Sequence, residues 1–339
     1  MASDSANDQS KSSLSLVDRV RHGQPIPAPL GWLLSAATPF VRIGMWSRAR
    51  KPVARVEAHV VSFGNLTAGG TGKTPAVIER ASREIDAGRK VGVLTRGYRA
   101  AAKVEVISAE ITPGEYYEKL GDEAALLLSR VPDIIVFKGR DRVAMAQRAV
   151  RDHGCEVLLL DDAFQYLRLH RDENVLLIDA ANPFGNGRLI PRGILREPLS
   201  AMKRATEVVL TRCDQANDLD GLVETVRALH PAAPLRKTVH APRELRRFSD
   251  GETLPIAMLK GQSVTALCGI GHPESFRATL ESLGARVDRF VRAPNHAEIP
   301  ASAIPDEGLA IVTEKDTVRL KELGDNVLCL CVELADFRE

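Results

Sequence analysis

The sequence has no surplus of charge of one sign. It carries 46 Lys and Arg against 44 Asp and Glu, a formal net charge of +2. So balanced a surface provides no field that would hold a polyanion, and we expect no nucleic acid partner. The five cysteines lie singly apart from Cys329 and Cys331, which predicts neither a disulfide framework nor a zinc cluster. Buried free thiols in a reducing compartment are the expectation.

The sequence also lacks the uninterrupted apolar run of about 20 residues that a membrane-spanning helix needs. The candidate segment, residues 30–46, contains Pro39 and Arg42 as well as both tryptophans. We expect residues 28–52 to form an interfacial helix on a membrane surface, preceded by a polar tail at residues 1–27 rather than a secretory signal. Packing against the protein's own surface is the alternative, because an apolar run does not identify its partner.

Short β-branched runs alternate with helix-like segments through the rest of the chain. The first series predicts strands at residues 60–63, 91–95, 134–137, 157–160, 175–178 and 208–211, with helices that include residues 74–87 and 140–153. The second predicts strands at residues 264–268, 287–291, 309–312 and 327–332, with helices at residues 273–283 and 315–323. The pattern predicts an α/β fold with a parallel-sheet domain at residues 53–225 and a smaller α/β domain at residues 226–339 that closes over the active site.

A glycine-rich loop directly follows the first predicted strand and precedes a helix. Its residues are Thr67, Ala68, Gly69, Gly70, Thr71, Gly72, Lys73 and Thr74. Backbone amides of such a loop surround phosphate oxygens, the lysine reaches the β- and γ-phosphates, and the last hydroxyl binds Mg²⁺. Thr67 stands where the standard motif has its first glycine. The context predicts a P-loop NTPase-type domain that binds ATP.

Two carboxylates, Asp161 and Asp162, end the apolar strand at residues 157–160. Ligands of α/β sheets bind at this edge, so one of the two is expected to hold Mg²⁺ together with Thr74. An aspartate pair at the end of a strand is also common as a turn or a helix cap. The upstream phosphate loop favours the metal-binding interpretation, and either carboxylate could be the ligand.

Several stretches together resemble the tetraacyldisaccharide 4'-kinase family of lipid A synthesis. They are Gly64-Asn65-Leu66-Thr67, Leu94-Thr95-Arg96-Gly97-Tyr98, Gly121-Asp122-Glu123, Asp161-Asp162-Ala163-Phe164-Gln165, Asn182-Pro183-Phe184-Gly185-Asn186-Gly187, Leu195-Arg196-Glu197-Pro198 and Thr313-Glu314-Lys315-Asp316. The resemblance implies transfer of the γ-phosphate of ATP to the 4'-hydroxyl of an acylated disaccharide 1-phosphate lipid. It also implies two α/β domains joined by a linker sheet, and a peripheral or monotopic location on the cytoplasmic face of the inner membrane. No obligate protein partner is expected.

The resemblance further implies that Asp122 is the general base and that His296, from the second domain, orients it. From the sequence alone, Asp122 would be a favourable charge at a helix N-terminus. The chain departs from the family at Ala163 and Tyr166, where the family has glycine and histidine, and at Asn295 and Ala297, where it has aspartate and a second histidine. It also has Ala124 where the family has proline.

Three arginines in loops rich in glycine and proline, Arg96, Arg192 and Arg196, are candidates for binding the anionic end of the acceptor. Pairing of Arg196 with Glu197 is the alternative.

A P-loop GTPase or metal-insertion chaperone is the competing function class, together with a nucleotide-gated scaffold. A guanine reader is missing, because Thr211-Arg212-Cys213-Asp214 stands where Asn-Lys-x-Asp is expected. A partition-type ATPase would need a lysine in place of Ala68. A non-enzymatic membrane adaptor is a further alternative, which lipid phosphorylation would exclude.

Overall fold

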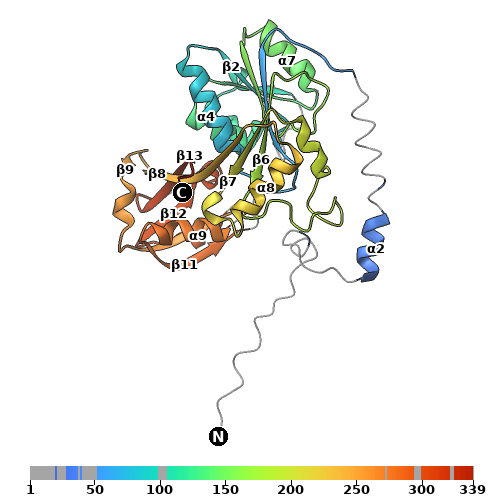
Figure 1. The fold of residues 1–339 in the computed structure, drawn as a ribbon. Helices are drawn as coiled ribbons and strands as arrows, with labels where there is room; N and C mark the ends of the chain where they lie inside the picture. The colour runs from blue at the N-terminus through green and yellow to red at the C-terminus, as the bar shows by residue number, and fades with distance from the viewer. Residues whose placement is uncertain are drawn as a thin grey trace.

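The computed structural model describes residues 20, 28–36, 39, 52–97, 105–271, 273–293, 299–320 and 324–338. Its strands join along one path, in which a first, largely parallel sheet continues into a second one (Figure 1). The first sheet has the order β7-β6-β1-β5-β2-β4-β3. Its strands are β1 (His59–Asn65), β2 (Val91–Thr95), β3 (Val106–Ile107), β4 (Ile135–Lys138), β5 (Val157–Leu160), β6 (Glu173–Asp179) and β7 (Glu207–Thr211). The central strand β1 pairs in parallel with β5 and with β6.

Helices cover both faces of the first sheet because alternate strand residues point to opposite sides. On one face, α4 (Lys73–Asp86) and α6 (Asp122–Arg130) share a buried cluster with Val61 and Leu159. On the other face, α7 (Arg142–Arg151) packs on Leu158, and α8 (Leu219–Leu229) on Val208. The shorter helices are α5 (Tyr116–Leu120), η1 (Ser108–Glu110), η2 (Pro113–Glu115), η3 (Leu199–Arg204) and η4 (Cys213–Gln215).

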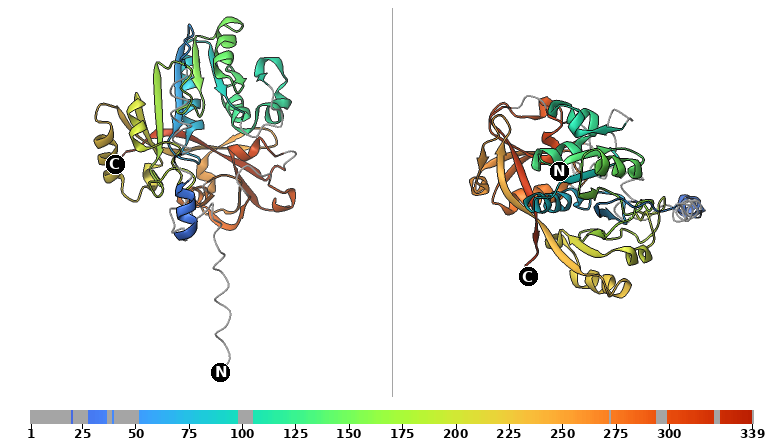
Figure 2. Two further views of the ribbon diagram at one scale, coloured as in Figure 1. Left: turned by 90° about the vertical axis from the view of Figure 1, so that its right-hand side faces the viewer. Right: turned by 90° about the horizontal axis from the view of Figure 1, so that it is seen from above.

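The second sheet has the order β11-β10-β12-β13-β8, with β9 paired to β8. Its elements are β8 (Leu235–Arg247), β9 (Thr253–Leu254), η5 (Ile256–Leu259), β10 (Ser263–Cys268), α9 (Pro273–Ser282), β11 (Arg286–Arg292), η6 (Ala301–Ala303), β12 (Leu309–Thr313), α10 (Glu314–Thr317) and β13 (Val327–Asp336). Strand β8 joins the two sheets: Leu235 pairs in parallel with β7, and the residues from Thr238 onward pair antiparallel with β13. Figure 2 shows this second sheet beside the end of the first.

The predicted α/β fold is confirmed, and every predicted strand overlaps an observed strand in sequence. Helix α10 ends at Thr317, whereas the sequence predicted a helix at residues 315–323; residues 321–323 lie outside the described part. Leu334, near the end of β13, packs into the core between α4 and the first sheet. The domain boundary after residue 225 stays a prediction.

Of the predicted anchor segment, the structure describes helix α2 (Ala28–Ala36), Pro39 and Pro52. Trp32 is 74% exposed and Leu33 is 69% exposed. Ser35 accepts a 2.8 Å hydrogen bond from Arg192, so α2 contacts the loop after β6. No helix within the described residues has the length and apolarity to span a membrane.

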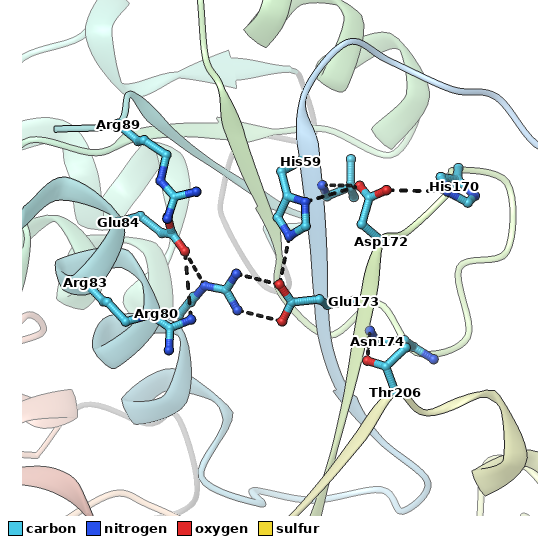
Figure 3. Close-up of polar contacts among 11 residues, drawn as sticks. His59, Arg80, Arg83, Glu84, Arg89, His170, Asp172, Glu173, Asn174 and Thr206 are labelled. Atoms are coloured by element: carbon cyan, nitrogen blue, oxygen red, sulfur yellow. Dashed lines mark hydrogen bonds and ion pairs between the residues drawn. The ribbon is translucent and has the colours of Figure 1, made fainter. Parts of the chain in front are cut away.

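A network of charged side chains lies where β1 and β6 begin (Figure 3). The Arg80 guanidinium donates to both oxygens of Glu173, at 2.8 and 2.7 Å, and to Glu84 at 2.5 Å. His59 Nε2 lies 2.7 Å from Glu173. Arg80 and His59 together hold the pKa of Glu173 at about 2, with the Arg80 hydrogen bond the larger cause. The network ties α4 to the first residues of β1 and β6, at the end of these strands opposite the phosphate loop.

Candidate functional site

The predicted phosphate loop connects the buried end of β1 to the start of α4. Gly72 has a φ of 74°, and a Cβ there would lie 2.5 Å from His240 Nε2. Glycine is therefore required twice, by backbone conformation and by close packing. Ala68, Gly69 and Gly70 are exposed, and a Cβ added to Gly69 or Gly70 would meet no atom within 4 Å. The space above the loop is open to a ligand.

The segment after Gly193 lies alongside the phosphate loop and fixes its first half. Ala68 N–H donates to Ile194 C=O at 2.7 Å, and Arg196 N–H donates to Leu66 C=O at 2.7 Å. Thr67 and Leu195 form an isolated antiparallel bridge. The Leu195-Arg196 motif is thus part of the loop's support.

The two aspartates after β5 face different environments. Asp161 is buried, and this burial, followed by the charge of Glu123, raises its pKa to about 7. Asp162 has a φ of 46°, accepts from Arg196 Nη1 at 2.8 and 2.9 Å, and lies 3.6 Å from Lys73 Nζ. Burial alone would raise the pKa of Asp162, but Lys73 and Arg196 outweigh it and hold the pKa below its ordinary value.

Asp122 is the first residue of α6 and lies between the two sheets. Its Oδ1 accepts from the Glu123 N–H at 2.9 Å, and its Oδ2 contacts the Arg319 guanidinium and lies 3.8 Å from Lys315 Nζ. The charge of Glu123, the second residue of α6, contributes to the raised pKa of Asp161. The structure therefore brings Lys73 and Asp162 together, and the first turn of α6 acts on Asp161 through the charge of Glu123.

The three candidate arginines are not equivalent. Arg96 is exposed after β2, and Arg192 donates to Ser35 of α2. Arg196 binds Asp162, whereas Glu197 accepts from Arg204. Arg196 therefore does not form the pair with Glu197 that the sequence left open. The predicted partner of Asp122, His296, lies outside the described residues.

Sequence reasoning missed three residues at this site. Thr211, considered only as part of an absent guanine reader, donates to Thr71 C=O at 3.1 Å and supports the loop. His240 packs behind Gly72, and burial followed by the Arg212 charge lowers its pKa to about 4. Arg319 reaches Asp122 across 197 residues of sequence. A strand or helix pattern carries no signal for such long-range contacts.

The donor set suits a nucleotide and magnesium. Within the described part of the chain, no group of three or more His, Cys, Asp or Glu could hold a metal ion by itself. Mg²⁺ commonly takes one or two carboxylates and completes its octahedron with water and phosphate oxygens. Asp161 and Asp162, which follow β5, and the hydroxyl of Thr74, in the first turn of α4, are donors of this kind.

The family described as "Tetraacyldisaccharide-1-P 4'-kinase" matches residues 24–337. The chain belongs to this family. It is 41% identical over 317 residues to "Tetraacyldisaccharide 4'-kinase" of Anaeromyxobacter dehalogenans strain 2CP-C, covering 87% of this chain and 83% of that protein. It is 35% identical over 329 residues to the protein of the same name from Syntrophus aciditrophicus, covering 90% and 88%.

Among solved structures, the chain is similar to Aquifex aeolicus LpxK in complex with ATP. The TM-score is 0.71 at 28% identity, covering 90% of this chain and 95% of that one. Family membership assigns a lipid A 4'-kinase function, a phosphotransferase reaction on a lipid disaccharide, as the resemblance predicted. The GTPase and chaperone alternative is not favoured.

Proposed function

We propose that the chain binds ATP on the loop from Thr67 to Thr74 and transfers the γ-phosphate to the 4'-hydroxyl of a tetraacyldisaccharide 1-phosphate lipid. The product would be lipid IVA, an intermediate of lipid A synthesis. The convergence of Lys73 and Asp162, 3.6 Å apart, beside the open loop supports this site most directly. The ATP complex of the Aquifex aeolicus protein supports the choice of nucleotide.

Lys73 would contact the β- and γ-phosphates, where its charge opposes the negative charge that develops during transfer. Thr74, Asp161 and Asp162 would hold Mg²⁺, which neutralises phosphate oxygens. Arg196 pairs with Asp162 and helps hold the Asp162 carboxylate near Lys73 of the phosphate loop. These residues bind and orient the donor; they take no part in removing the proton of the acceptor.

Asp122 would act as the general base, with His296 orienting it. The acceptor 4'-oxygen forms a bond to the γ-phosphorus. The bond between the γ-phosphorus and the oxygen that bridges it to the β-phosphorus breaks, and ADP leaves. The hydroxyl proton passes to the Asp122 carboxylate. The position of Asp122 at the start of α6, next to Glu123, whose charge acts on Asp161, supports this role.

Arg96 and Arg192 would bind the anionic end of the acceptor. Arg192 already contacts α2, whose Trp32 and Leu33 are exposed. We propose that these apolar side chains enter the surface of the inner membrane on its cytoplasmic face, so that the lipid approaches Arg192 from the bilayer. Exchange of both for serine would then abolish pelleting with anionic lipid vesicles; unchanged pelleting would contradict the membrane contact.

Two domains, divided near residue 225, would enclose this site, and no obligate protein partner is proposed. Because β8 joins the two sheets, its first residues would act as the connection.

The test is incubation of the purified chain with labelled ATP, Mg²⁺ and the disaccharide 1-phosphate lipid, with the phosphate position read by mass spectrometry. We expect a second phosphate at the 4'-position. Lys73→Ala should lower kcat/KM by about 10²- to 10³-fold, since one preorganised charge contact is lost. Phosphorylation elsewhere, or full activity of the variant, would contradict the proposed function.

A further inference from the structure

The turn that carries Asp122 is held from within the first sheet. Gly121, with a φ of 99°, separates α5 from α6. Lys138, the last residue of β4, donates its Nζ to the C=O of Lys119 at the end of α5. The backbone before Asp122 is therefore fixed to the carboxyl end of β4, but this contact does not orient the carboxylate.

The carboxylate is held from the second sheet by Arg319, which follows α10. The Arg319 side chain is 2% exposed and the Asp122 side chain 11%. Arg319 Nη2 donates to Asp122 Oδ2, and Nη1 lies 3.3 Å from the Gly269 C=O and 3.4 Å from Asp316 Oδ1. One guanidinium thus contacts Asp122 of α6, the Gly269 C=O just after β10, and Asp316 of α10.

Arg319 is itself braced. Asp316, 1% exposed, accepts from the Gly269 N–H at 3.1 Å and from the Thr313 hydroxyl at 2.5 Å. A buried charge pair is favourable only when additional hydrogen bonds fix its geometry. The strand ends of β10 and β12 supply those bonds, so the guanidinium presents one defined face to Asp122.

We propose that Arg319 is a positioning residue of the kinase: its guanidinium, held at the ends of β10 and β12, fixes the Asp122 carboxylate for proton removal. This inference rests on the proposed role of Asp122. It makes the chemical step depend on the contact between the two sheets, while donor binding depends on the phosphate loop.

A merely adhesive role of Arg319 is the competing explanation, and the interface contains a matched control. Arg130, at the end of α6, donates to Glu314 of α10 at 2.5 Å. Their side chains are 9% and 11% exposed, and Glu314 also accepts from the Val332 N–H at 3.1 Å. This pair joins α6 to α10, just before Arg319 in the sequence, and is similarly buried. It lies at the other end of α6 from Asp122.

The experiment compares Arg319→Met with Arg130→Met in the lipid phosphorylation assay, with melting temperatures recorded for both. For Arg319→Met we expect kcat to fall about 10- to 100-fold, the scale of a small misplacement of a reacting group, with KM for ATP within about twofold. Arg130→Met should keep kcat within about twofold. Arg319→Lys, which retains the charge but not the planar fork, should fold as the wild type and recover only part of kcat.

Equal kcat values for the two methionine variants, or full activity of Arg319→Lys, would overturn the positioning role and leave the proposed function intact. If Arg319→Met fails to fold, Arg319→Lys decides between the two explanations. A wild-type chain without lipid phosphorylation would overturn both proposals together.

Discussion

Two charged networks lie at opposite ends of the strands of the first sheet, and the carboxylates of Glu173 and Asp122 within them differ in exposure. Figure 3 shows the network where β1 and β6 begin. Its outer members, His59 and Glu173, have side chains 39% and 33% exposed, whereas Arg80 and Glu84 are 12% and 0% exposed. At the other end of the strands, Asp122 and Arg319 are 11% and 2% exposed. Water can replace a lost partner of Glu173 but not of Asp122. Charges that must keep one geometry for chemistry are therefore found in the closed network.

Removing one carboxylate from each network gives the largest expected difference. Asp122→Asn keeps the shape of the side chain but removes the proposed base, so kcat should fall by about 10²- to 10⁴-fold. Glu173→Gln removes a carboxylate that also accepts from an arginine, but at the opposite end of the strands, and should leave kcat within about twofold. Steady-state kinetics with saturating ATP and lipid measures both.

Binding of ATP separates loss of catalysis from loss of folding in this pair. Both variants should bind ATP as the wild type does, because the phosphate loop is unchanged. An Asp122→Asn variant that turns over at the wild-type rate would remove Asp122 from the mechanism, and an inactive Glu173→Gln variant would show that the comparison of the two networks is wrong.

The open network should instead matter for stability, through Arg80. Its side chain is 12% exposed and contacts Glu84, whose side chain is 0% exposed. Breaking a buried ion pair costs about 3–5 kcal/mol of unfolding free energy. Because Glu173 is accessible to water and Arg89 also contacts Glu84, we expect Arg80→Met to lower the unfolding free energy by only about 2 kcal/mol. Urea unfolding measures the loss, and kcat should not change.

Arg151→Met is the matched control for Arg80→Met. Arg151 also donates twice to a carboxylate, that of Asp152, but its side chain is 71% exposed. We expect no measurable change in the urea midpoint for this variant. Similar midpoint shifts in the two variants would show that burial does not decide the strength of these pairs.

The sequence predicted the parts of the candidate site that depend on local sequence. Gly72-Lys73-Thr74 between a strand and a helix, and Asp161-Asp162 after a strand, depend on neighbours a few residues away. Patterns of this kind show in the sequence because backbone conformation and strand burial are set locally. Asp122 was identified by resemblance, since its local pattern indicated only a helix start.

The contacts that complete the site join distant parts of the chain. Arg319 meets Asp122 only because β8 and β13 bring the second sheet beside α6. His240 meets Gly72 for the same reason, as it lies on β8 just after the residues paired with β7. The sequence predicted strands but not their order, so these partners could not be inferred.

His240, which packs behind Gly72, provides a pH test of the end of the sheet that carries the phosphate loop. Its Nε2 is buried and, among the described residues, has no hydrogen-bond partner, unlike His59, which contacts two carboxylates. Burial, followed by the Arg212 charge, lowers the pKa of His240 to about 4, from an ordinary value of 6.5. As pH falls below 6.5 the unfolded chain therefore binds this proton first, and stability is lost between pH 6.5 and 4.

At pH 5 the loss from His240 is about 2 kcal/mol, because each pH unit below the ordinary pKa costs about 1.36 kcal/mol. Glutamine does not titrate, so His240→Gln should lose that much less free energy of unfolding between pH 7.5 and pH 5 than the wild type. Urea unfolding at the two pH values measures the difference. Parallel losses in the two proteins would mean that the imidazole behind Gly72 takes up its proton as readily in the folded chain as in the unfolded one, and hence that this end of the sheet admits water.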